Sequence, residues 1–328
     1  MKKILSLITS NPLLFKYRPN GLYCFNYHRI GDAYNTQFDP NVFSCDEYLF
    51  EEHLKFYKSN FDIINIDELN SLKESKKKLN NRFALITFDD GYIDNFTLAY
   101  PLLKKHQVPA VFFIATDFIE KEIIPWWDEI AFLIKNSNQK TLQLENWKNS
   151  ISLTSHFQDE HIKKVLQLIK LDSSKPMDEK IINLKTALNL KADYMPPHKD
   201  LFMSWGMLRE MQDNGMTIGS QSCSHSIMSH LSLKEQKYEA VHSKKLLSEQ
   251  MEKDIISFAY PVGGASAFTE VTEKVLEESC YTLGFSFIAG INRTINNHSY
   301  HLKRFSVAGN SSVEQLKKQI NKATLKLL

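Results

Sequence analysis

The sequence predicts an α/β fold in which helices surround a parallel sheet. Short apolar runs rich in β-branched and aromatic residues alternate with longer segments of helical periodicity, which is typical of successive strand and helix units. Hydrophobic residues make up 43% of the 328 residues and charged residues 24%, a balance that allows the chain to bury a core. Residues from about 118 to 200 interrupt the alternation with helical patterns alone, so we expect a helical insertion there.

The expected strands are short and mostly apolar. They cover residues 22–27, 62–66, 83–88, 110–115, 217–219, 255–259, 282–287 and 303–307. Helices are expected at about 46–58, 93–107, 204–214, 232–253, 268–279 and 311–327, and within the insertion at about 127–136, 159–170 and 177–190. Two helix starts show the capping-box pattern, in which a hydroxyl residue is followed three positions later by a carboxylate: Ser232 with Glu235, and Ser311 with Glu314.

Charge and cysteine content exclude several classes of protein. Lys and Arg total 40 against 38 Asp and Glu, so the net charge of +2 offers no basic field for nucleic acid. The four cysteines lie far apart in the sequence, which argues against a zinc ribbon or a redox pair and favours reduced thiols. No apolar run reaches the roughly 18 residues of a membrane-spanning helix, so we expect no transmembrane segment.

The first 20 residues are interpreted as a separate N-terminal segment. Lys2 and Lys3 precede an apolar run, as in a signal peptide, but Pro12 and its polar neighbours interrupt the run and no small-residue cleavage site follows. We therefore expect an uncleaved segment, with a peripheral helix as one option, on a cytoplasmic protein whose contact with a membrane surface stays open. Residues 21–328 are expected to form one domain that contains the insertion.

The densest chemical signal is TFDDG at 87–91, where an apolar strand runs directly into two carboxylates. The carboxyl ends of strands are where α/β sheets and barrels build their sites. Two adjacent acids repel each other, so keeping both ionised needs a cation or several hydrogen-bond donors. Asp-Asp-Gly is also ordinary β-turn chemistry, and taken alone it would favour a turn.

Four ordered segments resemble the polysaccharide deacetylases, also called the NodB-homology or family-four carbohydrate esterases. They are NYHRI at 26–30, TFDDG at 87–91, the approach to a second motif at 202–219, and FAYPVG at 258–263. The resemblance implies a distorted (β/α) barrel of the polysaccharide deacetylase type. It also implies a metal-dependent hydrolase that removes acetyl groups from N-acetylated or O-acetylated polysaccharide or its sugar precursors, in the biosynthesis of cell-surface polysaccharide.

By this resemblance Asp89 is the general base and Asp90 a metal ligand. The second motif of the family carries two metal-binding histidines four residues apart, and the matching stretch here is QSCSH at 221–225. Gln221 thus replaces the first histidine, while His225 keeps the second. A shifted register with His225 and His230 restores two histidines but at a spacing of five, so we prefer Gln221. Zinc is the first expectation for the metal. Because an amide oxygen binds zinc less well than imidazole does, manganese or magnesium are alternatives.

The resemblance implies roles for further residues. The backbone N–H of Val262, directly after the proline of FAYPVG, would stabilise an oxyanion, and Ala259 stands where many members carry an arginine that steers the base. His28 is the candidate general acid and His301 the reserve candidate. The expected substrate contacts are Tyr92, Tyr260, Pro261, Trp126 and Trp127, although the two tryptophans could instead pack in the core or anchor the insertion.

Two other functions stay open at this point. Gln221 could mark a weakened or inactive member that binds glycan or a biosynthetic partner, although two intact carboxylates favour an enzyme. A hydrolase of small non-sugar amides would use the same metal and base, although the large insertion favours a larger substrate.

Overall fold

The computed structural model describes residues 9–121, 123–145, 147–154, 158–172, 174–196 and 201–327. The chain divides into two compact units. The first comprises residues 1–31, 44–121 and 200–328, and the second residues 32–43 and 122–199. The expected insertion therefore falls almost entirely in the second unit, together with the separate stretch 32–43. The first eight residues of the expected N-terminal segment lie outside the described residues.

The first unit is built on a parallel sheet that closes almost completely into a barrel. Its strands are β1 (Gly21–Tyr27), β4 (Asp62–Ile63), β5 (Arg82–Phe88), β6 (Val111–Ile114), β9 (Thr217–Ser220), β10 (Ser257–Ala259), β11 (Leu283–Phe285) and β12 (Arg304–Ser306). They follow the order β11-β10-β9-β6-β5-β1-β12, and β4 pairs with β5 beside that path. Backbone hydrogen bonds between residues 284–288 and 302–304 bring β11 to β12. The predicted distorted (β/α) barrel is confirmed.

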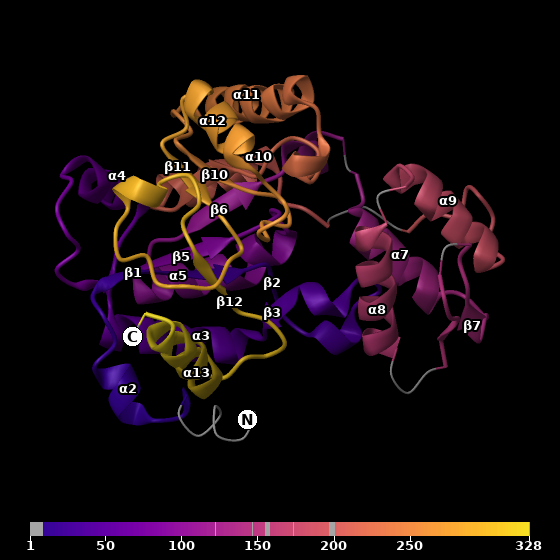
Figure 1. Cartoon of the computed structure of the whole chain (residues 1–328), viewed down its shortest axis with the longest axis horizontal. Coiled ribbons are helices and arrows are strands. Elements are labelled where there is room, and N and C mark those ends of the chain that lie inside the picture. The colour runs from indigo at the N-terminus through magenta and orange to yellow at the C-terminus, as the bar shows by residue number, and fades with distance from the viewer. Residues whose placement is uncertain are drawn as a thin grey trace. The chain divides into compact units, whose positions relative to one another are not determined.

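Helices cover the outside of this sheet (Figure 1). They are α2 (Pro12–Lys16), α3 (Glu47–Asn60), α4 (Ile66–Glu74), α5 (Tyr100–His106), α6 (Thr116–Glu120), α10 (Trp205–Asp213), α11 (Leu233–Met251), α12 (Glu270–Glu278) and α13 (Val313–Leu325). A π-helical turn, Asn95–Ala99, precedes α5, and two short strands, β2 (Arg29–Ile30) and β3 (Phe43–Cys45), lie outside the barrel sheet. Helices α10, α11 and α12 lie on one side of the strands, and α3 and α13 on the other.

The helix caps confirm one prediction and correct another. The capping box at Ser232 is present at the start of α11. At α13 the box is formed by Ser312 and Gln315, one residue later than predicted. The neighbouring Ser311 has another role, because its carbonyl oxygen accepts a hydrogen bond of 2.7 Å from Nε2 of the buried His53.

Side-chain alternation separates the interior of the barrel from an outer core beneath the helices. Leu22 and Cys24 of β1 join an inner apolar cluster with residues of β5, β6, β10 and β11, whereas Tyr23 and Phe25 pack in the outer core. Towards the carboxyl end of the strands, the side chains that face the barrel interior become polar. They are Asn26 of β1 and Thr87 of β5, and both are fully buried. Because side chains alternate along a strand, the first carboxylate of TFDDG continues this polar row.

The second unit is mostly helical. It contains α7 (Trp126–Lys135), α8 (Gln158–Leu171) and α9 (Met177–Ala187) around an apolar core of its own. It also contains an antiparallel pair, β7 (Thr141–Leu142) with β8 (Ile151–Ser152), which the sequence analysis did not predict because each strand is only two residues long. The stretch 32–43 is hydrogen-bonded to α7, because the N–H of Asp39 donates to Oδ1 of Asp128 at 2.9 Å.

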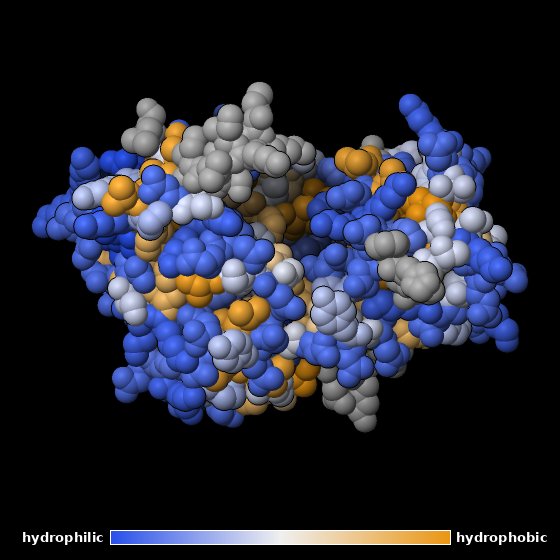
Figure 2. Space-filling view, turned by 90° about the horizontal axis from the view of Figure 1, so that it is seen from below, coloured by the Kyte–Doolittle hydropathy of each residue, from blue (hydrophilic) through white to orange (hydrophobic). Residues whose placement is uncertain are grey.

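No helix in the described part of the chain has the length and apolarity needed to cross a membrane. Figure 2 shows one face of the molecule, on which hydrophobic residues are scattered among hydrophilic ones. All four cysteines are free thiols, three of them buried and Cys280 exposed.

The buried His53 makes stability depend on pH. Burial lowers the pKa of His53 to about 4 from an ordinary 6.5. The unfolded chain therefore takes up a proton near pH 6.5 and the folded chain only near pH 4, so the free energy of unfolding should fall as pH drops through this window, by about 2–3 kcal/mol at pH 4.5. Urea unfolding at pH 7 and pH 4.5 measures this loss. Between these two pH values, His53→Gln should lose less stability than the wild type, whereas the exposed His230→Gln should lose as much as the wild type. Equal losses in the wild type and both variants would contradict the assignment to His53.

Candidate functional site

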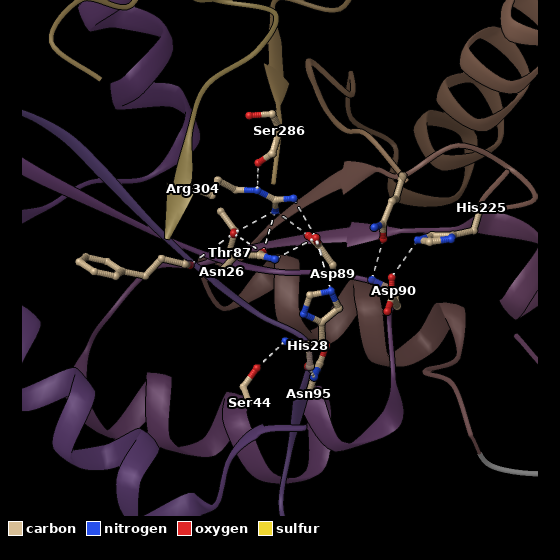
Figure 3. Close-up of polar contacts among 12 residues, drawn as sticks. Asn26, His28, Ser44, Thr87, Asp89, Asp90, Asn95, His225, Ser286 and Arg304 are labelled. Atoms are coloured by element: carbon tan, nitrogen blue, oxygen red, sulfur yellow. Dashed lines mark hydrogen bonds and ion pairs between the residues drawn. The ribbon is translucent and has the colours of Figure 1, made fainter. Parts of the chain in front are cut away.

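Two buried carboxylates follow β5 at the carboxyl-terminal edge of the barrel sheet. Asp89 and Asp90 are each only 2% exposed. The N–H of Asp89 donates to the carbonyl of Tyr27 at 2.9 Å, which continues the ladder between β5 and β1. Asp90 then adopts a φ of 76°, a left-handed conformation that aspartate tolerates better than most residues. The two side chains consequently point apart, Asp89 towards Arg304 and Asp90 towards His225 (Figure 3).

Arg304, the first residue of β12, holds the Asp89 carboxylate in a bidentate ion pair. Its Nη1 lies 2.7 Å from Oδ1 of Asp89 and its Nη2 lies 2.8 Å from Oδ2. Nη1 also donates to Oδ1 of Asn26 at 2.7 Å, and Nε donates to the carbonyl of Ser286 at 2.9 Å. Asn26 completes the cage by donating to Oδ2 of Asp89 at 3.0 Å. These contacts fix the orientation of the carboxylate and compensate its charge.

This arginine was not among the residues predicted from the sequence. The position at which a base-steering arginine was considered is Ala259, which is buried on β10. The charge comes instead from β12, 215 positions after Asp89. One signal could have revealed it: Arg304 lies inside the short strand expected at 303–307, and an arginine on a barrel strand needs an anionic partner wherever it is buried.

Asp90 lies against both residues of the preferred second-motif register. Its Oδ1 is 3.2 Å from Nε2 of His225, and its backbone N–H donates to Oε1 of Gln221 at 2.7 Å. Burial alone would raise the pKa of Asp90, but the hydrogen bond with His225 and the charges of His28 and His225 outweigh burial, and the pKa falls below its ordinary 3.8. The structure thus brings Asp90, Gln221 and His225 together, whereas His230 is exposed in the following turn.

The donors around Asp90 suit a divalent cation, with one weak ligand. The 3.2 Å between Asp90 Oδ1 and His225 Nε2 is close to the ~3.3 Å that separates two tetrahedral ligands ~2.0 Å from zinc. Within the described residues, no group of three His, Cys, Asp or Glu side chains could hold a metal ion. The Gln221 amide oxygen, which lies beside Asp90, could serve as a third ligand. That oxygen already accepts the Asp90 N–H and has one lone pair left.

His28 approaches Asp89 from a different side than Arg304 does (Figure 3). Its Nε2 is 4.0 Å from Oδ2 of Asp89, and its side chain is 23% exposed. The backbone of His28 is fixed by Ser44, whose Oγ accepts the N–H at 3.0 Å, and by Asn95, which donates to the carbonyl at 2.6 Å. A partly exposed imidazole is thus held close enough to Asp89 for one water to connect them.

Val262 has a strained backbone. Its φ is 62°, and the N–H of Gly263 donates to the carbonyl of Pro261 at 2.7 Å, which closes a tight three-residue turn around Val262. A β-branched residue rarely adopts positive φ, and such strain persists only where surrounding contacts enforce it. Here the N–H of Phe287 provides one such contact by donating to the carbonyl of Gly263 at 2.6 Å.

Three predicted substrate contacts are buried. Tyr92 is fully buried and stacks on Phe202 with ring centroids 4.9 Å apart. Tyr260 is 1% exposed and its hydroxyl donates to the carbonyl of Tyr300 at 2.6 Å. Pro261 is buried as well. All three side chains are buried in the loops that carry the site, and their role in substrate binding stays a prediction.

The other predicted residues make contacts of their own. Trp126 and Trp127 begin α7 in the second unit, where their rings meet edge to face at 5.5 Å and Trp126 packs on the core of that unit. Their role in sugar binding stays a prediction. His301, the reserve acid, pairs with Glu273 of α12, whose Oε1 is 2.7 Å from its Nδ1.

Sequence comparisons point to a single family. The sequence profile of the polysaccharide deacetylases matches residues 76–283. YxkH of Bacillus subtilis, which is named after the polysaccharide deacetylases, is 23% identical over 291 residues, 88% of this chain and 73% of the relative. A poly-β-1,6-N-acetyl-D-glucosamine N-deacetylase of Staphylococcus aureus is 30% identical over 122 residues. This match covers 34% of the chain and only 42% of the staphylococcal protein.

Comparison with solved structures gives the same fold. The deacetylase PplD of Streptococcus pyogenes superimposes with a TM-score of 0.60 at 18% identity, over 92% of this chain and 99% of the other. IcaB from Ammonifex degensii superimposes with a TM-score of 0.58 at 17% identity, over 93% and 98% of the two chains. At these identities the likeness establishes the barrel fold.

Proposed function

Because the chain belongs to the polysaccharide deacetylase family, we propose that it hydrolyses the N-acetyl groups of a sugar polymer or its precursors. The observation that carries this proposal is the different surroundings of the two adjacent carboxylates. Asp89 is held by Arg304 and faces the partly exposed His28, whereas Asp90 lies against His225 and Gln221. One carboxylate is thus arranged to move a proton and its neighbour to bind a cation, which is the division of work that amide hydrolysis needs.

For each step of this reaction, a residue of the site can then be proposed. Arg304 and Asn26 use three of about four lone-pair positions on the Asp89 carboxylate, so one remains to accept a proton from the attacking water. Asp90, His225 and Gln221 would hold a divalent cation, which when bound polarises the acetyl carbonyl and makes the water more acidic.

Two further groups complete the proposed reaction. The N–H of Val262 would donate to the oxyanion that forms as the water attacks the carbonyl. His28, partly exposed and close to Asp89, would give a proton to the leaving amine. The carbon–nitrogen bond then breaks, and acetate and a free amino sugar are released.

A second function, glycan binding without hydrolysis, is favoured by one observation. In the preferred register Gln221 stands where the family motif has a metal-binding histidine, and its amide oxygen already accepts the Asp90 N–H. A side chain that supports the backbone in this way has a role even when no cation is bound.

Acetate release from defined sugars tests the proposal. We choose β-1,6-linked N-acetylglucosamine oligomers, because the staphylococcal relatives are named for that polymer. The full chain is assayed with added Zn²⁺, Mn²⁺ or Mg²⁺, and O-acetylated sugars serve to separate the two linkages. Release of acetate with free amines supports the proposal. Binding of the oligomer without acetate release under any of the three metals supports the second function instead.

Gln221→His is expected to tighten zinc binding by roughly ten-fold or more, because imidazole nitrogen replaces an amide oxygen as ligand. If the wild type is a loosely metallated enzyme, acetate release at low zinc should rise as well, and the difference should shrink at saturating zinc. Zinc competition titrations measure the affinity, with the exposed Gln315→His as the control. An unchanged zinc affinity would show that residue 221 is not a metal ligand.

A further inference from the structure

The loop that carries Gln221 and His225 is held by a carboxylate that the proposed reaction does not use. This carboxylate belongs to Glu239, in the second turn of α11, which is only 7% exposed. Its Oε2 accepts the backbone N–H of Cys223 at 2.7 Å and that of Ser224 at 3.0 Å. Its Oε1 accepts the hydroxyl of Ser224 at 2.7 Å. One buried carboxylate thus receives three donors from a single short loop.

The opposite edge of the same loop is bound by the first turn of α6. The N–H of Thr116 donates to the carbonyl of Ser222 at 3.2 Å, and the N–H of Asp117 donates to the carbonyl of Cys223 at 2.9 Å. The loop therefore crosses between two helices, with its carbonyl groups bound by α6 and its N–H groups bound by Glu239.

The loop needs such support because its backbone is strained at two positions. Ser222 has a φ of 68° and His225 a φ of 57°, and neither is glycine. Each left-handed residue of this kind costs about 1 kcal/mol or more and persists only where neighbouring contacts enforce it. A second residue of α11, Ser243, also supports the loop. Its Oγ accepts a hydrogen bond from Ser220 Oγ at 2.8 Å, and Ser220 Oγ in turn accepts the N–H of Ser222 at 3.2 Å.

We propose that Glu239 is the positioning residue for His225. By binding the two amides just before His225, Glu239 sets the backbone from which the imidazole reaches Asp90 at 3.2 Å. Metal and proton chemistry tolerate shifts of only about 0.5 Å. Releasing the loop therefore weakens cation binding and slows the reaction without touching any group that contacts the substrate. The effect on turnover rests on the proposed function, whereas the effect on His225 does not.

Glu239→Gln tests the inference with the shape of the side chain preserved. The amide removes the negative charge that the two backbone N–H groups bind, and its NH₂ group replaces the acceptor oxygen opposite the Ser224 hydroxyl, which then has to turn from donor to acceptor. The first readout is the imidazole ¹H–¹³C signal of His225 in metal-free protein, assigned by its absence in His225→Ala. The second is the dissociation constant for Zn²⁺, and the third is acetate release. The control is Glu278→Gln, which removes the surface carboxylate paired with Lys237 of α11 at 2.9 Å.

In Glu239→Gln the His225 signal should shift or split while that of His301 stays in place. Zinc binding should weaken by roughly 10–100-fold, and kcat should fall with KM nearly unchanged. Glu278→Gln should alter none of these. If Glu239→Gln does not fold, Glu239→Asp is measured instead, because it keeps the charge but is too short to hold both amides.

An unmoved His225 signal with unchanged zinc affinity in a folded variant would overturn the inference. A wild type that releases no acetate, combined with a shifted His225 signal in the variant, would refute the proposed function and leave the positioning role of Glu239 intact.

Discussion

Replacing Arg304 with methionine is expected to destabilise the protein by about 3–5 kcal/mol, because Asp89 would be left as a buried charge without its partner. Arg304 is 1% exposed and donates to Asp89, Asn26 and Ser286 at once. Urea unfolding measures the loss. Arg304→Lys should recover only part of the stability, since an ammonium group cannot reproduce the bidentate contact together with the other two.

Two comparisons show whether the lost charge pairing is the cause. Adding Asp89→Asn to Arg304→Met should restore part of the stability, because the unpaired charge is then removed. The exposed Arg209→Met should change stability by no more than about 0.5 kcal/mol. A loss below about 1 kcal/mol for Arg304→Met would mean that Asp89 finds another partner or takes up a proton.

Asp89→Asn is expected to reduce acetate release by about 10²–10⁴-fold, because an amide cannot accept the proton of the attacking water. The same change leaves a buried arginine unpaired, so stability must be measured alongside the rate. Rates are compared at a temperature where wild type and variant are both fully folded. A turnover within a few-fold of the wild type would show that another group is the base.

Metal content separates the roles of the two carboxylates. Asp90→Ala should lose bound divalent metal, since it removes the carboxylate that lies against His225 and Gln221. Asp89→Asn should keep the metal while losing the activity. Equal loss of metal from both variants would mean that both carboxylates bind it.

Local sequence patterns were sufficient for most of the barrel. The strands lie close to their predicted ranges, because a run of apolar residues that ends at a turn signal marks a buried strand without knowledge of its neighbours. The cap at Ser232 was predicted in the same way, whereas the cap of α13 was misplaced by one residue. Sequence could not show that His53, far away in the chain, binds the carbonyl of Ser311.

Side-chain direction near the site was harder to predict. Tyr92 and Tyr260 stand beside recognisable motifs, yet both rings are buried. Alternation along a strand predicts which way a side chain points only while the backbone stays extended. The positive φ at Asp90 and at Val262 ends that regularity at the residues where the site is built.

By itself, the sequence determined the barrel, its family and the pair of carboxylates at the end of β5, because each of these depends on residues close together in the chain. Only the tertiary structure decided which cation balances Asp89. Arg304 reaches it because β12 lies beside β1 and β1 beside β5, with Asn26 of β1 bonded to both partners. Strand order is set by long-range packing of the whole barrel, so a partner 215 positions away leaves no trace in the local pattern around TFDDG.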